Sequence, residues 1–450
     1  MVLKISSMVF KVKRHKHELV KPSNPTPNEL KLLSNIDDQL GFRYHVPLIF
    51  LYRYNPSMLG KDPVQVIREA LSKTLVFYYP FAGRLMECSN GKLMVNCNGE
   101  GVMFIEADAD VTLDDFDNNF VPPFPCFDEL LYNVPGSDGI IDSPLLLIQV
   151  TRLKCGGFIF SLRMNHTMSD GSGISQFLKA LSELANEAKE PSILPMWCRE
   201  LLCAREPPKV TCIHREYQQL PPDTKSNFIH HSFFFGPKEI AAIRALLPHH
   251  LSKSTSFKIL TACLWRCRTK ALQWKNSNEE IRLLCIVNAR CRLNPPLPEG
   301  FYGNTVVFPA AVTTVGKLCG RPLGYAVELV KNAKNEATEE YVHSMIDLME
   351  TNGRPCFTRS GSFVVSNISK ASLKDLDFGW GKALYGGVAK AGLGDIPGVS
   401  VYMHFTNSKG EQGRVVPICL PINAMERLEK ELDNILKANN NGKMILRSNF

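Results

Sequence analysis

The stretch NHTMSDGSG, residues 165–173, lies where the hydrophobic period of the chain changes, and it therefore decides how its two flanks fold. Before it, GGFIFSLRMN (residues 156–165) places apolar side chains at alternate positions, which is typical of a strand. After it, ISQFLKALSELANEA (residues 174–188) repeats apolar residues at i, i+3, i+4 and i+7, which predicts an amphipathic helix. Ser172, or Asp170 just before it, can cap that helix. His166 is thus predicted at a strand end, in a turn that leads into a helix.

Three roles for His166 are compatible with this position: a catalytic base, a metal ligand, or a core histidine held by a neighbouring carboxylate. Side chains at strand ends commonly reach a cleft, and a neutral imidazole with a pKa of about 6.5 can take a proton from an alcohol. Asp170, four residues later, can orient the ring or stabilise the turn. The spacing alone leaves these alternatives open.

A chain of 450 residues is longer than one hydrophobic core usually fills, so we expect two lobes with a cleft between them. Helical and strand periods mix in both halves, which predicts an α+β fold. We assign residues 1–190 to an N-terminal lobe, the proline-rich residues 191–223 to a crossover linker, and residues 224–450 to a C-terminal lobe. A segment near residues 365–395 is a candidate for packing with the N-terminal lobe.

Composition restricts the classes of partner. The net charge of +8 is spread along the chain, and KVKRHKHELVK (residues 11–21) contains apolar spacers, so it predicts a solvated edge strand rather than a nucleic-acid arm. The 14 cysteines stand singly, without the spacing of a zinc site, which indicates reduced thiols and no metal. No signal peptide or membrane span is apparent. We expect a cytoplasmic protein that binds neither nucleic acid nor membrane.

Several catalytic motifs are missing from the sequence. It has no phosphate-binding P-loop, GLGDIPG (residues 392–398) misplaces the third glycine of a dinucleotide fingerprint, and the DFG at residues 377–379 has no accompanying kinase motifs. A serine esterase usually carries G-x-S-x-G, and neither Ser169 nor Ser172 has glycines at both offsets. A serine-type esterase stays as an alternative without a motif to support it.

The combination of H-x-x-x-D-G (residues 166–171) with DFGWG (residues 377–381) resembles the signature pair of the BAHD acyltransferases, plant enzymes that transfer acyl groups from coenzyme A thioesters to alcohols or amines. YYPFAGRL, LTACLWR, VNAR and YGN (residues 302–304) extend the resemblance over nearly the whole chain. PTPNELKLLSNIDDQ and LPINAMERLEKEL are similar to the alcohol acyltransferase branch, which includes fruit ester-forming enzymes, benzyl alcohol benzoyltransferases and a lupin-alkaloid tigloyltransferase.

The resemblance implies a two-lobed fold like that of chloramphenicol acetyltransferase, in which each lobe is a mixed sheet with flanking helices and a channel runs between them. It implies an acyl-CoA-dependent O-acyltransferase that makes an ester from an acyl-CoA and a small alcohol or hydroxylated alkaloid, in a ternary complex with His166 as general base. Acyl-CoA is then a co-substrate and no cofactor is held permanently. A non-catalytic acyl-CoA-binding member of the same fold is a further alternative, and we expect a monomer.

The resemblance also implies roles for residues around His166. Asp170 is structural and points toward an arginine, for which Arg290 of VNAR is the candidate, and Trp380 helps to hold the thioester carbonyl. The remaining implied residues fall into two sets: Asp377, Gly379 and Gly381 are structural, while Ser256, Lys258, Thr261 and Ser366 contact coenzyme A. The chain departs from the family pattern at Gly171, which replaces an alanine, and at Asn367, which replaces an aspartate.

Overall fold

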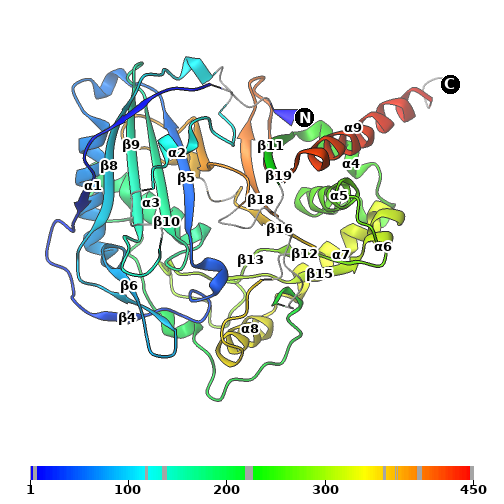
Figure 1. Ribbon diagram of the computed structural model, residues 1–450, viewed down its shortest axis with the longest axis horizontal. Helices are drawn as coiled ribbons and strands as arrows, with labels where there is room; N and C mark the ends of the chain where they lie inside the picture. The colour runs from blue at the N-terminus through cyan, green and yellow to red at the C-terminus, as the bar shows by residue number, and fades with distance from the viewer. Residues whose placement is uncertain are drawn as a thin grey trace.

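The computed structural model of the protein shows two lobes side by side, each built on a mixed β-sheet (Figure 1). It describes residues 2–3, 8–116, 120–133, 139–217, 227–357, 361–369, 371, 373–392 and 398–445. The predicted α+β architecture with two lobes is confirmed. No helix in the described part of the chain is long and apolar enough to cross a membrane.

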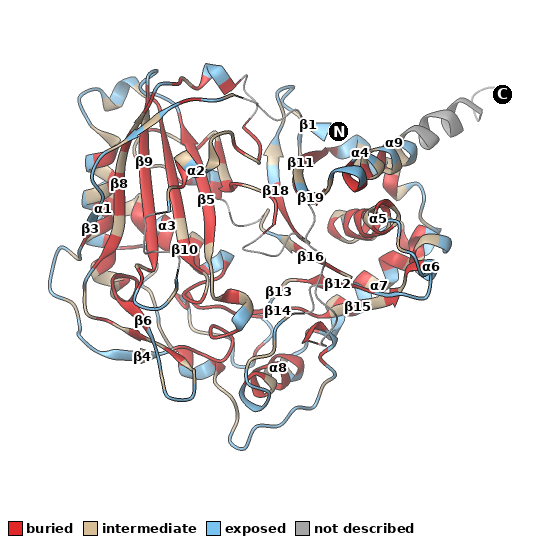
Figure 2. Cartoon of the chain, in the orientation of Figure 1, coloured by how far each residue is buried: buried red, intermediate tan, exposed pale blue. Residues whose placement is uncertain are grey.

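The N-terminal sheet has the strand order β17-β5-β10-β9-β8-β2, and β3 also pairs with β8. Strands β8 and β9 are parallel, whereas β10 is antiparallel to both of its neighbours. Its central strands are buried along most of their length, as Figure 2 shows. The strands of this sheet are β2 (Val12–Arg14), β3 (Glu18–Val20), β5 (His45–Tyr52), β8 (Val102–Ala109), β9 (Leu146–Leu153), β10 (Phe158–Asn165) and β17 (Tyr385–Val388).

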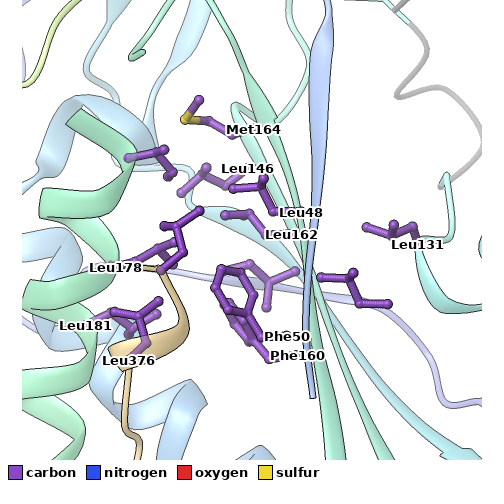
Figure 3. Close-up of a cluster of buried hydrophobic side chains, with 14 of the residues drawn as sticks. Leu48, Phe50, Leu131, Leu146, Phe160, Leu162, Met164, Leu178, Leu181 and Leu376 are labelled. Atoms are coloured by element: carbon purple, nitrogen blue, oxygen red, sulfur yellow. The ribbon is translucent and has the colours of Figure 1, made fainter. Parts of the chain in front are cut away.

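Helix α3 (Gly171–Ala185) covers one face of this sheet, next to α1 (Pro63–Phe77). Alternate residues of β5 and β10 point toward α3, where Leu178 and Leu181 meet them (Figure 3). The apolar stripe that predicted the helix is therefore the face that packs on the sheet. The lobe also holds α2 (Phe127–Leu130) and a small sheet of β4 (Leu30–Leu32), β7 (Leu93–Asn96) and β6 (Arg84–Glu87).

The C-terminal sheet has the order β1-β11-β19-β18-β16-β12-β15. Helix α5 lies at the centre of its helical layer and packs against α4, α6, α7 and α9 (Figure 1). The strands are β1 (Val2–Leu3), β11 (Phe228–Phe235), β12 (Glu280–Cys285), β15 (Ala310–Thr314), β16 (Ser362–Asn367), β18 (Val399–Thr406) and β19 (Gln412–Pro421), with β13 (Val287–Asn288) paired to β14 (Val306–Val307). The helices are α4 (Pro237–Arg244), α5 (Ser256–Ala271), α6 (Val315–Gly320), α7 (Leu323–Glu336), α8 (Glu339–Thr351) and α9 (Ile422–Ile445).

The two sheets exchange edge strands. Strand β17, from the second half of the chain, pairs with β5 of the N-terminal sheet, and β1, at the start of the chain, pairs with β11 of the C-terminal sheet. Between the lobes, the chain from residue 191 to residue 217 has no regular structure beyond short 3-10 turns. The predicted linker end at residue 223 and lobe start at residue 224 lie outside the described residues.

Most predicted elements are present with shifted ends. The run at residues 11–21 forms two short edge strands, β2 and β3, that both pair with β8, which confirms the predicted solvated edge. The helix that was predicted to begin at residue 174 begins three residues earlier, at Gly171, because its N-cap is Asp170. Among the elements that escaped prediction are β5, α4 and α8. The apolar side chains of β5 run without alternation because both of its faces are buried.

Candidate active site

The turn after β10 is fixed by its own polar side chains. The amide oxygen of Asn165 accepts hydrogen bonds from the backbone N–H of Thr167 at 3.1 Å and from its hydroxyl at 2.8 Å. The backbone N–H of His166 donates to the carbonyl of Tyr44 at 2.9 Å. These bonds hold His166 at the end of β10, close to the start of β5, as the change of period predicts.

Asp170 ends the turn and begins helix α3. Its Oδ1 accepts hydrogen bonds from the N–H groups of Ser172 at 3.0 Å and Gly173 at 3.1 Å, so the cap is Asp170 and not Ser172, the other candidate. The first turn of the helix lies against the C-terminal half, since a Cβ on Gly173 would stand 1.9 Å from the carbonyl oxygen of Tyr302. Glycine is therefore required at position 173.

Asp170 also forms an ion pair across the lobe boundary. Arg290 Nη1 and Nη2 donate to its two carboxylate oxygens at 2.7 and 3.0 Å, and the N–H of Thr305 donates to Oδ2 at 3.1 Å. Burial raises the pKa of Asp170, but the Arg290 guanidinium and the neighbouring N–H groups outweigh burial and hold the pKa below its ordinary value. The geometry matches the pairing that the family resemblance implies for Asp170 and Arg290.

The ring of His166 stands between aromatic side chains. It stacks on Phe42, with ring centroids 4.4 Å apart, and meets the edge of Tyr44 at 5.6 Å. Its Nδ1 is sealed from solvent and makes no hydrogen bond to the described residues. Burial lowers the pKa of His166, and its own carbonyl and the Asp170 carboxylate offset this only in part. The imidazole is therefore neutral at pH 7.

His166 faces a cavity of about 340 Å³ that both lobes line. The N-terminal sheet contributes Val46, Leu48 and Met164, and the C-terminal half contributes strand ends, including Ser366 of β16. The described lining is mostly apolar: Phe42, Val46, Leu48, Met164, His166, Ser169, Asp170, Gly171, Ser172, Ile174, Ile286, Asn288, Val306, Phe308, Ser366, Asn367, Ile368, Ala371, Leu373, Val388 and Val401. A neutral base in an apolar cleft between lobes can deprotonate a bound hydroxyl group.

The DFGWG segment lies elsewhere. The carboxylate of Asp377 accepts hydrogen bonds from the N–H groups of Gly379 at 2.7 Å and Gly381 at 2.8 Å, and both glycines have positive φ values, +103° and +90°. The backbone carbonyl of Asp377 accepts hydrogen bonds from the side chains of Ser182 and Asn186 at the end of α3. Because α3 begins beside His166 and spans 15 residues, Asp377 is about 20 Å from the base.

The expected contact of Trp380 with a thioester carbonyl requires correction. The Trp380 ring packs edge-on against Phe158, with centroids 5.3 Å apart, in the core of the N-terminal lobe. Phe158 begins β10 whereas His166 follows its last residue, so strand geometry separates them by roughly 25 Å. Trp380 belongs to the packing around DFGWG, and its ring does not reach the reaction centre.

The residues implied for coenzyme A are divided among different places. Ser366 lines the cavity in front of His166, and Ser256 lines a second cavity, of about 580 Å³, on the C-terminal lobe. The Thr261 hydroxyl is buried and donates to the Tyr402 hydroxyl at 3.3 Å. The backbone N–H of Lys258 donates to the hydroxyl of Thr255, which is the N-cap of α5. The described lining of these two cavities includes neither Thr261 nor Lys258.

Three cavities lie in the region between Ser366 and Ser256. A cavity of about 200 Å³ shares Ile368 and Leu373 with the His166 cavity, and Lys374, Asp375 and His404 also line it. His404 pairs across β18 and β19 with Arg414, which lines the second cavity with Arg244. Nε of Arg414 is buried without a hydrogen-bond partner in the described residues. The cavity at His166 is mostly apolar, whereas the cavity at Ser256 includes two arginines in its lining.

Four residues that the sequence analysis did not single out support the histidine. Phe42 stacks on its ring, and Asn304 Nδ2 donates to the carbonyl of His166 at 2.8 Å. Asp37 accepts a hydrogen bond from Asn304 Nδ2, and Arg199 donates one to the carbonyl of Met168. YGN and the IDDQ segment were visible only as parts of the family resemblance, and nothing in their local spacing indicates that they meet at His166.

A hydrogen-bonded Ser–His–Glu series occurs at a different place. Ser344 Oγ lies 2.9 Å from His214 Nε2, and His214 Nδ1 lies 3.1 Å from Glu216 Oε1. However, the Ser344 side chain is fully buried, and its oxygen accepts two backbone N–H groups of the linker, from Thr211 and Cys212. It anchors the linker to α8 and cannot act as a nucleophile.

Comparison with known proteins gives consistent matches. The model of the Transferase family matches residues 10–435. The chain is 61% identical to 13-hydroxylupanine O-tigloyltransferase of Lupinus albus, over 99% of both chains. It is 58% identical to benzyl alcohol O-benzoyltransferase of Petunia hybrida, over 96% of this chain and 95% of the relative. It is 52% identical to (Z)-3-hexen-1-ol acetyltransferase of Arabidopsis thaliana, over 96% of both.

Two solved structures share the fold. Vinorine synthase superposes with a TM-score of 0.74, covers 94% of this chain and 98% of its own, and is 24% identical. F. sporotrichioides TRI101, complexed with coenzyme A and T-2, superposes with a TM-score of 0.68, covers 89% of this chain and 97% of its own, and is 17% identical. At these identities the likeness concerns the fold.

We expect Asp170→Ala to lower the free energy of unfolding by about 3–5 kcal/mol, because Arg290 would be left without its buried anion. The pKa of Asp170 is lower in the folded state than in the unfolded state. The difference in the free energy of unfolding between the wild type and the variant is therefore greatest above the ordinary aspartate pKa. It disappears as the pH falls through the folded-state pKa. Urea denaturation at pH 7 measures it. The control is Asp375→Ala, which removes an exposed ion pair with Lys382 and should change little. Equal stabilities of the two variants would contradict the assignment.

Proposed function

Because the chain belongs to the BAHD acyltransferase family, in its alcohol acyltransferase branch, we propose that it transfers the acyl group of an acyl-CoA thioester to the hydroxyl group of a small alcohol or hydroxylated alkaloid. The observation that carries the proposal is the neutral His166 ring, which faces an apolar cavity lined by both lobes. A thioester and an alcohol can meet there away from bulk water.

The proposed reaction is a direct transfer within a ternary complex. The imidazole of His166 takes the hydroxyl proton while the alcohol oxygen attacks the thioester carbonyl, which forms an oxyanion. The carbon–sulfur bond then breaks, and the imidazolium gives the proton to the departing thiolate, so that an ester and free coenzyme A result. Because Nδ1 is the sealed nitrogen, we assign both proton transfers to Nε2.

We propose that acyl-CoA extends from the cavity at His166 across the neighbouring cavity to the one at Ser256. Its thioester would lie beside Ser366, and its phosphates would lie where Arg414, Arg244 and Ser256 line the second cavity. The arrangement suits the co-substrate because its pantetheine arm is long and its nucleotide end is anionic. Lys258 and Thr261 are left out of this contact set.

The two alternative functions, a serine-type esterase and a non-catalytic acyl-CoA-binding protein, receive less support. A serine esterase needs a serine beside its histidine, and the hydroxyl of Ser169 instead donates to the carbonyl of Tyr302 at 2.7 Å. In the described residues, no serine hydroxyl is hydrogen-bonded to His166. A non-catalytic acyl-CoA-binding protein would not need a neutral histidine at the meeting point of the cavity walls.

We further propose a cytoplasmic monomer. The fourteen cysteines are free thiols, which suits a reducing compartment. One chain supplies the base, its ion pair and both walls of the cavity, so the proposed reaction requires no second copy.

We expect His166→Ala to lower turnover by at least about a hundredfold while the protein stays folded, because general-base assistance is lost. The readout is thiol release from acetyl-, tigloyl- and benzoyl-CoA with benzyl alcohol, hexenol and 13-hydroxylupanine as acceptors. The matched control is His250→Ala, which removes an exposed histidine paired with Glu328 and should keep full activity. Full turnover by His166→Ala would refute the assignment of the base.

The pH profile of kcat/KM should fall on its acid side with a midpoint below 6.5, the ordinary value for histidine. Burial lowers the pKa of His166, so the active, neutral form persists to lower pH than it would for an exposed imidazole. Initial rates from pH 4.5 to 8.5 measure the midpoint. A midpoint above 6.5 would show that a different group is titrating.

Arg414→Gln should raise the KM for acyl-CoA by about tenfold and leave the KM for the alcohol unchanged, because one charged contact to phosphate is lost. The control is Arg321→Gln, since Arg321 is exposed on the C-terminal lobe and packs over Tyr325. Steady-state kinetics with each substrate varied in turn separate the two constants. An unchanged KM for acyl-CoA would remove Arg414 from the proposed path.

A further inference from the structure

Asp37 lies behind the loop that carries His166, and its side chain is fully buried. Its Oδ1 accepts three hydrogen bonds: from Arg199 Nη1 at 2.5 Å, and from the backbone and side-chain nitrogens of Asn304 at 2.9 Å each. Its Oδ2 accepts two more, from the N–H and hydroxyl of Ser34 at 3.1 and 2.6 Å. One carboxylate thus gathers donors from three segments of the chain.

Two of these residues, Asn304 and Arg199, also donate hydrogen bonds to the histidine loop, residues 166–168. Asn304 Nδ2 also donates to the carbonyls of His166 at 2.8 Å and Thr167 at 3.3 Å. Arg199 Nη2 donates to the carbonyl of Met168 at 2.7 Å. The backbone carbonyls of residues 166–168 are therefore all bound by groups that Asp37 holds.

The charge of Asp37 determines how the Asn304 amide is oriented. The Oδ1 atom of Asn304 is buried and has no hydrogen-bond partner in the described residues. The rotation of the amide is therefore fixed only by the hydrogen bonds that Asn304 Nδ2 donates. If the amide rotated by half a turn, its oxygen would face the Asp37 carboxylate and two carbonyl oxygens. The negative charge therefore selects the orientation that binds the His166 carbonyl.

Arg199 is fixed as rigidly as Asn304. Its guanidinium lies over the rings of Trp197 and Tyr302, at 4.5 and 5.1 Å from their centroids. A Cβ on Gly303 would stand 2.0 Å from Nη1, so the guanidinium lies directly against the backbone there. The arginine cannot follow the loop if the loop moves, and it holds Met168 in one place.

We propose that Asp37 is a positioning residue for catalysis, which sets the place of His166 through Asn304 and Arg199. The inference rests on the proposed function, in which His166 is the base. A shift of about 1 Å in a reacting group can cost on the order of a hundredfold in rate, so a support of this kind affects turnover even when the fold is intact.

The anionic charge also affects the titration of the histidine. Burial lowers the pKa of His166, whereas the carboxylates of Asp170 and Asp37 raise it. Neutralising Asp37 removes one of these two anions, so the pKa of His166 should decrease further. Loss of a buried carboxylate that does not act on His166 would leave that pKa where it is.

The test compares Asp37→Asn with Asp347→Asn. Asp347 is also fully buried and holds the same linker, since it accepts bonds from the N–H and Nε of Arg205 at 2.8 and 2.7 Å. Its bonds do not extend to residues 166–168. We expect Asp37→Asn to lower kcat by about 10- to 100-fold with a KM for acyl-CoA within about twofold of the wild type, and to shift the acid limb to lower pH. Asp347→Asn should lose thermal stability and keep both kcat and the pH profile.

The measurements are kcat per folded protein, with circular dichroism as the measure of folding. Equal kcat values for the two folded variants, or an unshifted acid limb in Asp37→Asn, would overturn the inference. If Asp37→Asn does not fold, Arg199→Lys decides: it keeps the charge but cannot reach Asp37 and Met168 together, so a wild-type kcat in it would overturn the inference. Activity of His166→Ala would instead overturn the proposed function, which separates the two failures.

Discussion

The ion pair between Asp170 and Arg290 joins the two halves of the chain beside His166, and the local structure around the histidine depends on it. The same carboxylate begins helix α3, so the helix that covers the N-terminal sheet and the wall of the other lobe start from one side chain. A buried carboxylate needs several donors to stay charged, and here they come from both lobes. The geometry of the cleft is therefore coupled to the folding of each lobe.

The interaction has a counterpart on the other side of the histidine loop. Asp170 binds backbone N–H groups that follow the loop, while Asp37 holds the groups that bind its carbonyls. Between them, the neutral ring of His166 faces an apolar cavity. Two buried anions thus support an uncharged base: they hold the backbone around it, and they offset part of the lowering of its pKa by burial.

The sequence was sufficient for the features that depend on local periodicity. The alternation in β10 and the stripe of α3 are properties of neighbouring residues and were predicted, and the cap was narrowed to Ser172 or Asp170. Strand β5 lacks alternation because both faces are buried, and Asp37 meets Asn304 across 267 positions, so no local pattern reveals either. Trp380 shows the converse limit: its family resemblance suggested contact with the thioester, but the fold places it at the far end of β10.

The exchange of edge strands has a consequence for synthesis on the ribosome. Strand β5 is made early, but its outer neighbour β17 is encoded more than 300 residues later, so the nascent N-terminal sheet has an unpaired edge during most of translation. An exposed strand edge invites pairing with other chains. Until residue 388 has left the exit tunnel, this sheet cannot close, and chaperones or neighbouring nascent chains have time to bind that edge.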